Sequence, residues 1–376
     1  MYNLLRPSLS LSLCMILLSP VASISEDAKP RKRKRIPIVS PLLGTHGEVT
    51  FQIKADKAER VVVQGQMPPG YIELVKGDQG LWSATIEGVM PGVYEYSFLV
   101  DGLRMLDPGN RYLKPMRSPK TSILYIPGAT PIDFNPDIEH GTIHFHEYHS
   151  KPIGRFRELN VYTPPGYENS TGDYPLLVLQ HGHSDSYATW TAHGKAHWIL
   201  DNLIASGNAK PMIVLMLDGH PIPSSYGNGR SPENTESLRK DLLEAALPMI
   251  EKKYRIKKGP EHRAIAGLSM GGMHAISIGL NELDHFGWIG AFSAAIPEQD
   301  SVNAVFSDVS RMNHAIRLLW IACGKKDSLV SENRRFIQRL ETEGIEHTWQ
   351  LTDGGHNWPV WREYLVSFLP ELFKFK

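Results

Sequence analysis

The sequence predicts two folded parts, an all-β sandwich and then an α/β domain with a mostly parallel sheet. Residues 38–128 form short runs that alternate apolar and polar side chains, with turn residues between them, which is typical of antiparallel strands. Residues 140–376 contain almost continuously apolar runs separated by helical patterns, which indicates strands covered by helices on both faces. The boundary is therefore expected in the Pro- and Asp-containing linker 129–139.

Residues 1–23 predict a cleaved signal peptide and a secreted or periplasmic protein. Arg6 precedes an apolar run that is too short to span a membrane, and small residues follow it. Cys14 within this run leaves a lipid anchor open as the alternative, although no stable membrane anchor is expected. The only other cysteine is Cys323, so the mature chain is expected to depend on a large core rather than on disulfides.

Residues 24–37 predict a solvated basic linker, because Lys29–Arg35 is rich in lysine and arginine and few apolar residues surround it. The whole chain balances 40 basic residues against 40 acidic ones. It offers no wide basic field, so a nucleic-acid partner is not expected.

The sandwich is expected to contain roughly seven short strands in about 90 residues. Its clearest runs are 48–53, 60–64, 81–86, 92–100 and 121–125. Tyr94-x-Tyr96-x-Phe98, the turn Asp101-Gly102 and the stretch 107–110 resemble the early-set immunoglobulin-like domains that are related to glycogen-binding modules.

The resemblance implies either sugar binding through exposed tryptophans or simple packing against a catalytic domain. Trp82 is the only tryptophan of residues 38–128, and its alternating position predicts a ring that faces the core. A packing or site-shaping role is therefore favoured over independent sugar binding.

The second part is expected to begin with an antiparallel pair at 141–148 and 156–162. The histidines near this pair suggest a metal site at first, since residues two apart share a strand face. No Asp, Cys or further His lies at a spacing that would complete a coordination sphere, so neither a metal nor another cofactor is expected. These histidines are His140, His144, His146 and His149.

Buried strands are predicted at 174–180 and 211–217, and helices at 196–205 and 237–250, the latter with a kink at Pro248. The polar, Gly/Pro-rich loop 218–232 follows the second strand. Loops at this end of parallel strands contact ligands in α/β sheets, which makes Tyr226 and Arg230 candidates for substrate binding.

The strongest chemical motif is Gly267-Leu-Ser269-Met-Gly271, which lies between an apolar strand and a helical pattern. A serine is nucleophilic only when it is held against a base, with N–H donors where an oxyanion forms. The strand, sharp turn and helix around the motif meet that requirement, so Ser269 is predicted to be the nucleophile.

Two partners follow Ser269 in the chain. Asp327 comes just after the apolar run 318–324, and His356 lies in a Gly-rich loop after the run 347–352. The order Ser, Asp, His is that of the α/β-hydrolase fold. His356 is therefore predicted to take the proton of Ser269, with Asp327 orienting the imidazole.

The loop after strand 174–180 is expected to complete the oxyanion hole. Met270 N–H is the first predicted donor and a backbone N–H near His183 the second, and Gly182 beside it is a candidate for substrate binding. The side chains of His181 and His183 are expected to hold this loop through local hydrogen bonds.

Long motifs in this half resemble the putative esterase family, which includes family 1 carbohydrate esterases (acetylxylan and feruloyl esterases), esterase D and enterochelin esterases. The resemblance implies the same triad and oxyanion donors, although His183 replaces a small or apolar residue usual in relatives. The matching stretches are 201–205, 261–272, 286–293 and Gly354-Gly-His-Asn-Trp358, whose Trp358 is a further substrate-binding candidate.

The sequence thus predicts a secreted serine esterase that removes acetyl or feruloyl groups from plant-type polysaccharide through an acyl-enzyme. A siderophore esterase of the enterochelin type is the alternative within the enzyme class, although a polyanionic substrate would favour a more basic loop. An inactive carbohydrate-binding protein is the alternative from another class, and the intact triad argues against it. The oligomeric state is left open.

Overall fold

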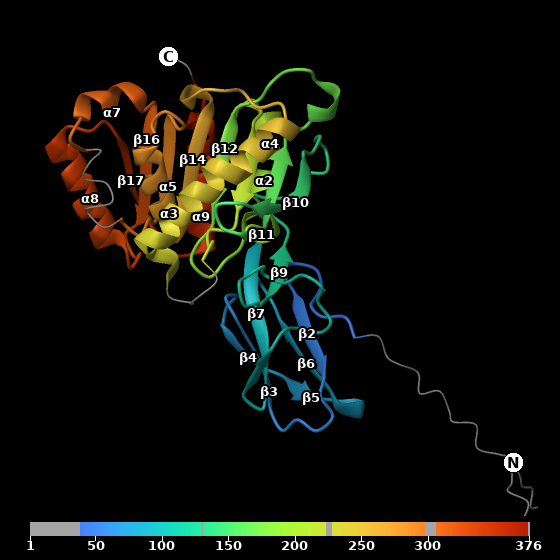
Figure 1. Ribbon diagram of the computed structural model, residues 1–376. Helices are drawn as coiled ribbons and strands as arrows, with labels where there is room; N and C mark the ends of the chain where they lie inside the picture. Colours follow the sequence, from blue (N-terminus) through green and yellow to red (C-terminus); the bar gives the residue numbers. More distant parts are fainter. Residues whose placement is uncertain (1–37, 129–130, 223–227, 298–305, 375–376) are drawn as a thin grey trace, which may run out of the picture. The chain divides into compact units, whose positions relative to one another are not determined.

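The structure is a computed structural model and describes residues 38–128, 131–222, 228–297 and 306–374 (Figure 1). The predicted signal peptide 1–23, the basic linker 24–37 and the candidate Tyr226 lie outside the described residues. Ile38–Lys376 form one compact unit by their contacts. The domain boundary near residue 140 stays a prediction.

The N-terminal part contains two antiparallel sheets, with strand orders β1-β2-β6-β5 and β4-β3-β7-β8, and β9 pairs with β7. Strands β6 and β7 have the predicted bounds. Trp82 on β6 is 6% exposed and belongs to the core between the sheets, as its alternation predicts. The strands are β1 (Leu42–Leu43), β2 (Val49–Lys54), β3 (Val61–Gly65), β4 (Tyr71–Glu73), β5 (Val75–Lys76), β6 (Leu81–Ile86), β7 (Gly92–Val100), β8 (Leu103–Met105) and β9 (Ser122–Ile126).

The C-terminal part is built on one sheet with the order β10-β11-β13-β12-β14-β15-β16-β17. The first three strands in this order are antiparallel neighbours and the remaining neighbours are parallel, so the predicted antiparallel pair and mostly parallel sheet are both present. The strands are β10 (Thr142–Ser150), β11 (Arg155–Thr163), β12 (Leu176–Gln180), β13 (Ile213–Leu217), β14 (Arg263–Leu268), β15 (Trp288–Phe292), β16 (Leu318–Gly324) and β17 (Thr348–Thr352).

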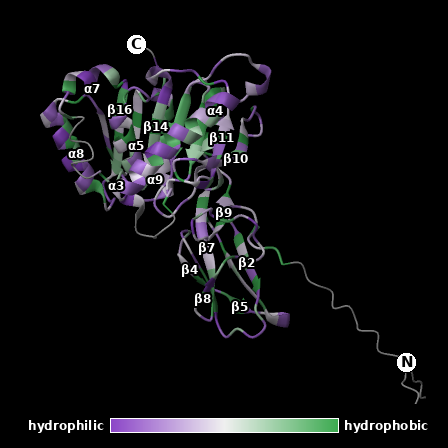
Figure 2. Cartoon of the chain, in the orientation of Figure 1, coloured by the Kyte–Doolittle hydropathy of each residue, from purple (hydrophilic) through white to green (hydrophobic). Residues whose placement is uncertain are grey.

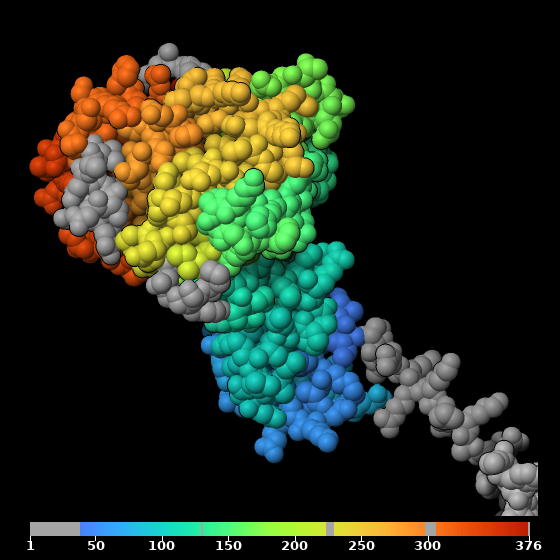
Figure 3. All heavy atoms as spheres, in the orientation of Figure 1, coloured from blue at the N-terminus to red at the C-terminus, as the bar shows by residue number. Residues whose placement is uncertain are grey.

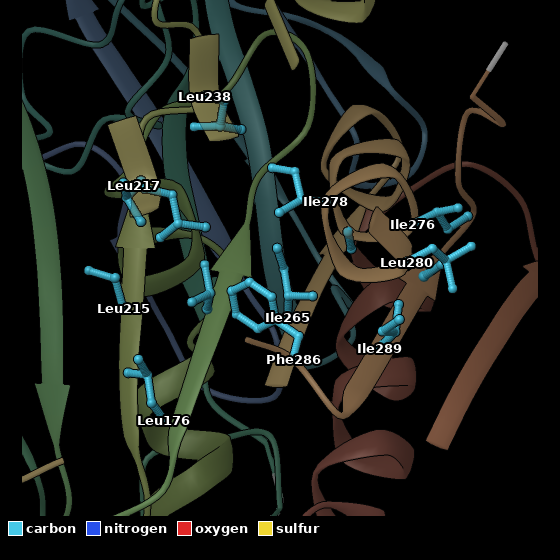
Figure 4. Close-up of a cluster of buried hydrophobic side chains, with 14 of the residues drawn as sticks. Leu176, Leu215, Leu217, Leu238, Ile265, Ile276, Ile278, Leu280, Phe286 and Ile289 are labelled. Atoms are coloured by element: carbon cyan, nitrogen blue, oxygen red, sulfur yellow. The ribbon is translucent and has the colours of Figure 1, made fainter. Parts of the chain in front are cut away.

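Helices cover both faces of this sheet because successive strand residues point to opposite sides. Ile265 on β14 joins the core under α3, α4, α5 and α8, whereas its neighbour Ala264 joins the core under α2 and α9. Figure 4 shows the first core, with Leu215 and Ile265 from the strands facing Leu238 and Ile278 from the helices. The helices are α1 (Thr189–Ala192), α2 (Ala196–Ala205), α3 (Pro232–Asp241), α4 (Leu247–Lys253), α5 (Met270–Asn281), α7 (Val309–Ala315), α8 (Val330–Glu343) and α9 (Trp358–Phe368).

The distribution of polarity follows these layers. Figure 2 shows hydrophobic residues concentrated in central strands such as β14 and β16, and hydrophilic ones along helices such as α8. In Figure 3 the atoms of α3 and α4, in yellow, form part of the surface over one face of the sheet. None of the helices in the described part of the chain has the length and apolar character that a membrane span requires.

The helix predicted at 237–250 is longer and irregular. It starts at Pro232, since Ser231 caps it by accepting a hydrogen bond from Asn234 N–H at 3.2 Å and proline suits the first turn. A π-helical turn, η4 (Leu242–Ala246), precedes α4, whose first turn contains Pro248. Proline cannot donate to the carbonyl four residues before it, so the irregularity falls just ahead of Pro248.

The predicted linker 129–139 is tied to the second part where it is described. Asn202 on α2 donates hydrogen bonds to the carbonyl oxygens of Pro131, at 2.9 Å, and Asp133, at 2.8 Å. Asp133 is itself buried, at 8% exposed. These backbone carbonyl groups accept hydrogen bonds from α2 rather than from water alone. The described part of the segment is therefore attached to the second part of the chain.

Candidate active site

Ser269 occupies a strained turn between β14 and α5. Its backbone has φ 54° and ψ −115°, a conformation that non-glycine residues rarely adopt and that here places the residue at the turn between the end of the strand and the helix. A Cβ on Gly267 would lie 2.5 Å from the backbone of Gly271, and one on Gly271 would lie 2.6 Å from the carbonyl oxygen of Gln180. Only glycine at both positions allows the strand ends and the helix to approach so closely.

The three residues predicted as a triad lie together. The Ser269 hydroxyl is 3.0 Å from His356 Nε2, so that it donates to the imidazole. The Nδ1 of His356 is 3.0 Å from both carboxylate oxygens of Asp327 and donates to them. These are the distances at which a base can take a proton from the hydroxyl while a carboxylate fixes its orientation.

Asp327 stays ionised in a buried position. It follows β16 and is 3% exposed. Burial alone would raise the pKa of this carboxyl, but hydrogen bonds from His356 and from Leu329 N–H at 2.8 Å hold the pKa below its usual range. The negative charge is therefore available to stabilise an imidazolium at His356.

The loop between β17 and α9 holds His356 by packing. The imidazole lies edge-on to the ring of Trp361, with centroids 4.9 Å apart. Asn357 caps α9 by accepting a hydrogen bond from Val360 N–H. The side chain of His356 is 28% exposed, so one edge of the imidazole remains accessible.

The β12 loop, defined here as Gly182–Ser186, faces Ser269. His181 just before it accepts a hydrogen bond from Gly219 N–H at Nε2 and donates from Nδ1 to the carbonyl of Gly182, each at 2.8 Å. His181 thus holds the loop as predicted. The ring of His183 instead lies edge-on to His220, with centroids 5.5 Å apart. Burial and then the nearby charges of Arg117 and Arg230 lower the pKa of His183.

Two backbone N–H groups are suitably placed to stabilise an oxyanion. Met270 begins α5, where the helix dipole and unpaired N–H groups favour negative charge, and His183 follows Gly182 in the β12 loop. A Cβ on Gly182 would lie 3.8 Å from the Cβ of Ser269, so the loop approaches the nucleophile closely. Among the described residues, neither N–H group donates a hydrogen bond.

A pocket of about 270 Å³ opens at Ser269 and His356. Gly182 and Arg230, both predicted to bind substrate, line it. Trp358 also lines it but is only 3% exposed, because its ring packs edge-on against Trp190 and Trp361. Most of the Trp358 ring therefore belongs to the core.

The sandwich helps to line this pocket, in keeping with the site-shaping role favoured above, but the sequence did not identify the residues involved. Gln66, Glu95 and Lys114 line it together with the β12 loop. Lys114 is 6% exposed, although it lies in a stretch without regular alternation. A buried lysine cannot be told from a solvated one by sequence pattern, so no signal was available for this residue.

The strand histidines all have protein partners. His140 contacts Asp201 at 2.9 Å, His144 contacts Thr163 at 2.9 Å, and His146 contacts the hydroxyl of Tyr254 at 2.6 Å. His149 lies edge-on to Phe156. In the described ranges, no group of three or more His, Cys, Asp or Glu side chains is arranged to hold a metal ion.

A serine on a sharp strand-to-helix turn of a mostly parallel sheet, with a histidine and an acid that follow it in the chain, defines the α/β-hydrolases. This fold class was expected from the sequence. Within it, the chain belongs to the family described as "Putative esterase", whose model matches residues 150–372.

Similar proteins include several esterases. An endo-1,4-beta-xylanase/feruloyl esterase of Xylanibacter ruminicola is 31% identical over 93% of this chain and 48% of its own length. The chain thus spans about half the length of the first curated relatives it matches. A solved ferulic acid esterase is 29% identical, with a TM-score of 0.53, and covers 61% of this chain and 97% of its own. The enterobactin esterase of Shigella flexneri, at 18% identity and a TM-score of 0.60, covers 87% of this chain and 93% of its own and shares the fold.

Proposed function

We propose that this protein is a serine carboxylesterase that removes feruloyl or acetyl groups from plant-type polysaccharide through an acyl-enzyme. The observation that carries the proposal is the 3.0 Å distance between Ser269 Oγ and His356 Nε2, two residues that line the pocket. On the apolar run and small residues of 1–23, we also propose that the protein is exported.

The first half of the reaction acylates Ser269. Its oxygen attacks the ester carbonyl while His356 Nε2 takes the hydroxyl proton, and Asp327 stabilises the resulting imidazolium. The N–H groups of Met270 and His183 stabilise the negative charge that forms on the carbonyl oxygen. When the tetrahedral intermediate collapses, His356 returns the proton to the leaving sugar alcohol, and the acyl group stays on Ser269.

The second half repeats these roles with water. His356 takes a proton from a water molecule, whose oxygen attacks the acyl carbonyl. The intermediate then collapses, the acid leaves, and the proton returns to Ser269 Oγ. No other group is required for this cycle.

The feruloyl assignment draws support from the relatives. The second part of this chain makes up less than two thirds of its length, so an alignment over 93% of the chain includes much of the sandwich. Likeness to a relative named for xylanase and feruloyl esterase activity therefore extends to both folded parts. A pocket bordered by His183 and Trp361 also suits a planar aromatic acid.

The charge of the pocket argues against a polyanionic siderophore. In the described lining, the cations Arg230 and Lys114 are matched by Glu95 and Asp185. Since Lys114 lies within 3.1 Å of both carboxylates, it offers little attraction to further anions.

A substrate panel tests the proposal. The purified protein would be assayed on p-nitrophenyl acetate, methyl ferulate, feruloylated arabinoxylan, acetylated xylan and a catecholate trilactone, with Ser269→Ala as the control. We expect release of ferulate or acetate from polymer that depends on Ser269. Preferred cleavage of the trilactone would replace the polysaccharide assignment, and a panel with no Ser269-dependent hydrolysis would reject the esterase.

A further inference from the structure

The sandwich contacts the β12 loop through its backbone. Met116 forms an antiparallel bridge with Asp185, and Arg117 N–H donates to the carbonyl of Ser184 at 3.1 Å. The hydroxyl of Ser186 donates to the carbonyl of Pro115, also at 3.1 Å. The segment Lys114–Arg117 therefore lies along the loop like an added strand, and it supplies a hydrogen-bond partner to the carbonyl of Ser184 and to the hydroxyl of Ser186.

Lys114 adds a charged link at the same place. Its Nζ lies 2.9 Å from Glu95 Oε1 on β7 and 3.1 Å from Asp185 Oδ1 in the loop. The three side chains are 8%, 13% and 5% exposed. One buried cation thus joins a carboxylate of the sandwich to a carboxylate of the β12 loop.

Of the two carboxylates, Asp185 depends more on Lys114 than Glu95 does. Glu95 also accepts hydrogen bonds from Thr121, at 2.9 Å, and Gln66, at 3.3 Å. Lys114 is the cation nearest to Asp185 in the described structure, and burial raises the pKa of Asp185 even though Lys114 opposes the rise. Removal of the lysine would leave a buried carboxylate that must take up a proton or move toward water.

Such a movement would reach the reacting atoms. The N–H of Asp185 donates to the carbonyl of Gly182 at 3.1 Å and closes the turn that contains His183. The N–H of His183 is the second oxyanion donor of the proposed reaction. Donors of this kind act only at hydrogen-bonding distance from the oxyanion, so a shift of about 1 Å is costly.

We propose that Lys114 is a positioning residue for catalysis, which holds the β12 loop through Asp185 so that the His183 N–H faces the oxyanion. The inference rests on the proposed esterase function. It concerns the chemical step on any ester, including small ones, and is separate from any role of the sandwich in binding polymer.

The test compares two lysines of the full chain. Lys114→Met removes the charge at nearly constant length, and we expect kcat on p-nitrophenyl acetate to fall roughly 10- to 100-fold with little change in KM. Lys195→Met is the matched control, since Lys195 also lies between the two parts, over the rings of Trp198 and Tyr125. This control is expected to keep its kcat, and Lys114→Arg should recover part of the loss.

A second arm establishes that Lys114 acts through Asp185. Asp185→Asn removes the same ion pair from the other side, and the double variant with Lys114→Met should lose much less than the product of the two single losses. Melting curves would reveal whether Lys114→Met folds. If it does not, Asp185→Asn replaces it in the test and should show the same loss of kcat.

Three results would overturn the proposal: a folded Lys114→Met protein with unchanged kcat, an equal loss in Lys195→Met, or a raised KM at constant kcat. The last would mean that Lys114 binds substrate directly. If the wild-type protein were no faster than Ser269→Ala, the proposed esterase function itself would be rejected. That result differs from the three results above, each of which concerns Lys114 in an active enzyme.

Discussion

The backbone N–H of Lys326 donates to the carbonyl oxygen of Gly354 at 2.9 Å, and this hydrogen bond joins the loop of Asp327 to the loop of His356. The two loops pack closely there, since a Cβ on Gly324 would lie only 2.4 Å from the same carbonyl oxygen. The contact between acid and base is therefore set by backbone packing beneath the side chains.

Gly324→Ala should lower kcat because the added methyl group must displace the backbone of Gly354 and with it His356. A shift of about 1 Å predicts a loss of up to roughly 100-fold. Gly172→Ala is the control, because a Cβ at that position meets nothing within 4 Å. Steady-state kinetics on p-nitrophenyl acetate measures both, and equal activity of the two variants would contradict the prediction.

Ser269→Ala should reduce kcat by at least about 10³-fold and leave the melting temperature unchanged, because alanine keeps the strained backbone and removes no packing. Ser277→Ala, on the same helix but outside the pocket of Ser269, should remain active. Activity of the Ser269 variant close to that of wild type would place the nucleophile elsewhere.

Ser269→Gly should be as inactive as Ser269→Ala but more stable. Glycine adopts positive φ without the cost of a Cβ, and the strain of such positions is about 1 kcal/mol or more. The expected gain in melting temperature over Ser269→Ala is about 2 °C for a chain of this size. Calorimetry of the two variants would measure it, and an equal or lower melting temperature for the glycine variant would show that the turn stores no such strain.

Lys195→Met should change the pH dependence of stability. Burial, with a smaller effect from the charge of Arg362, lowers the pKa of Lys195 from 10.5 to about 8. Between these two values the unfolded chain keeps a proton that the folded chain has lost, so wild-type stability gains from Lys195 as the pH rises. Below pH 8 both states are protonated and the folded state bears the full cost of the buried cation.

The measurement is the melting temperature of wild type minus that of Lys195→Met, from pH 7 to pH 10. This difference should become more positive above pH 8, since other titrating groups contribute equally to both proteins. A flat difference would mean that the lysine is solvated or well paired in the folded state.

Trp82→Ala should destabilise the protein by about 3–5 kcal/mol without changing its retardation in gels that contain starch, glycogen or xylan. The ring is in the sandwich core, and its Nε1–H donates to the carbonyl of Ala55 at 3.0 Å. Tyr112→Ala is the control for an exposed ring, at 59% exposed, and should leave stability unchanged. Lost retardation in a folded Trp82 variant would mean that this ring binds sugar.

Sequence periodicity predicted much of the framework. The strands β6, β7 and β16 and the helix α2 have the bounds that their apolar spacing indicated, because each buries one continuous face or both faces. The triad could also be predicted from the sequence, because glycines and strand ends fix where Ser269, Asp327 and His356 lie. The chain order Ser, Asp, His then indicated the topology of the α/β-hydrolases.

The particular residues through which the sandwich contributes to the pocket could not be predicted in this way. The bridge between Met116 and Asp185 joins two irregular segments, and neither has a period that specifies its partner. The burial of Lys114 depends on two carboxylates far away in the chain, Glu95 and Asp185. Contacts of this kind follow from tertiary packing, which local helix and strand propensities do not predict.

The strand-like contact between Lys114–Arg117 and the β12 loop has a consequence for how such proteins evolve and are engineered. A gene fusion that replaced the sandwich with an unrelated module would have to supply both a backbone edge and a cation for Asp185. Without them the graft would carry an intact Ser269 and His356 but a loosened loop. In protein engineering, residues 38–376 should therefore be moved or optimised together as one unit.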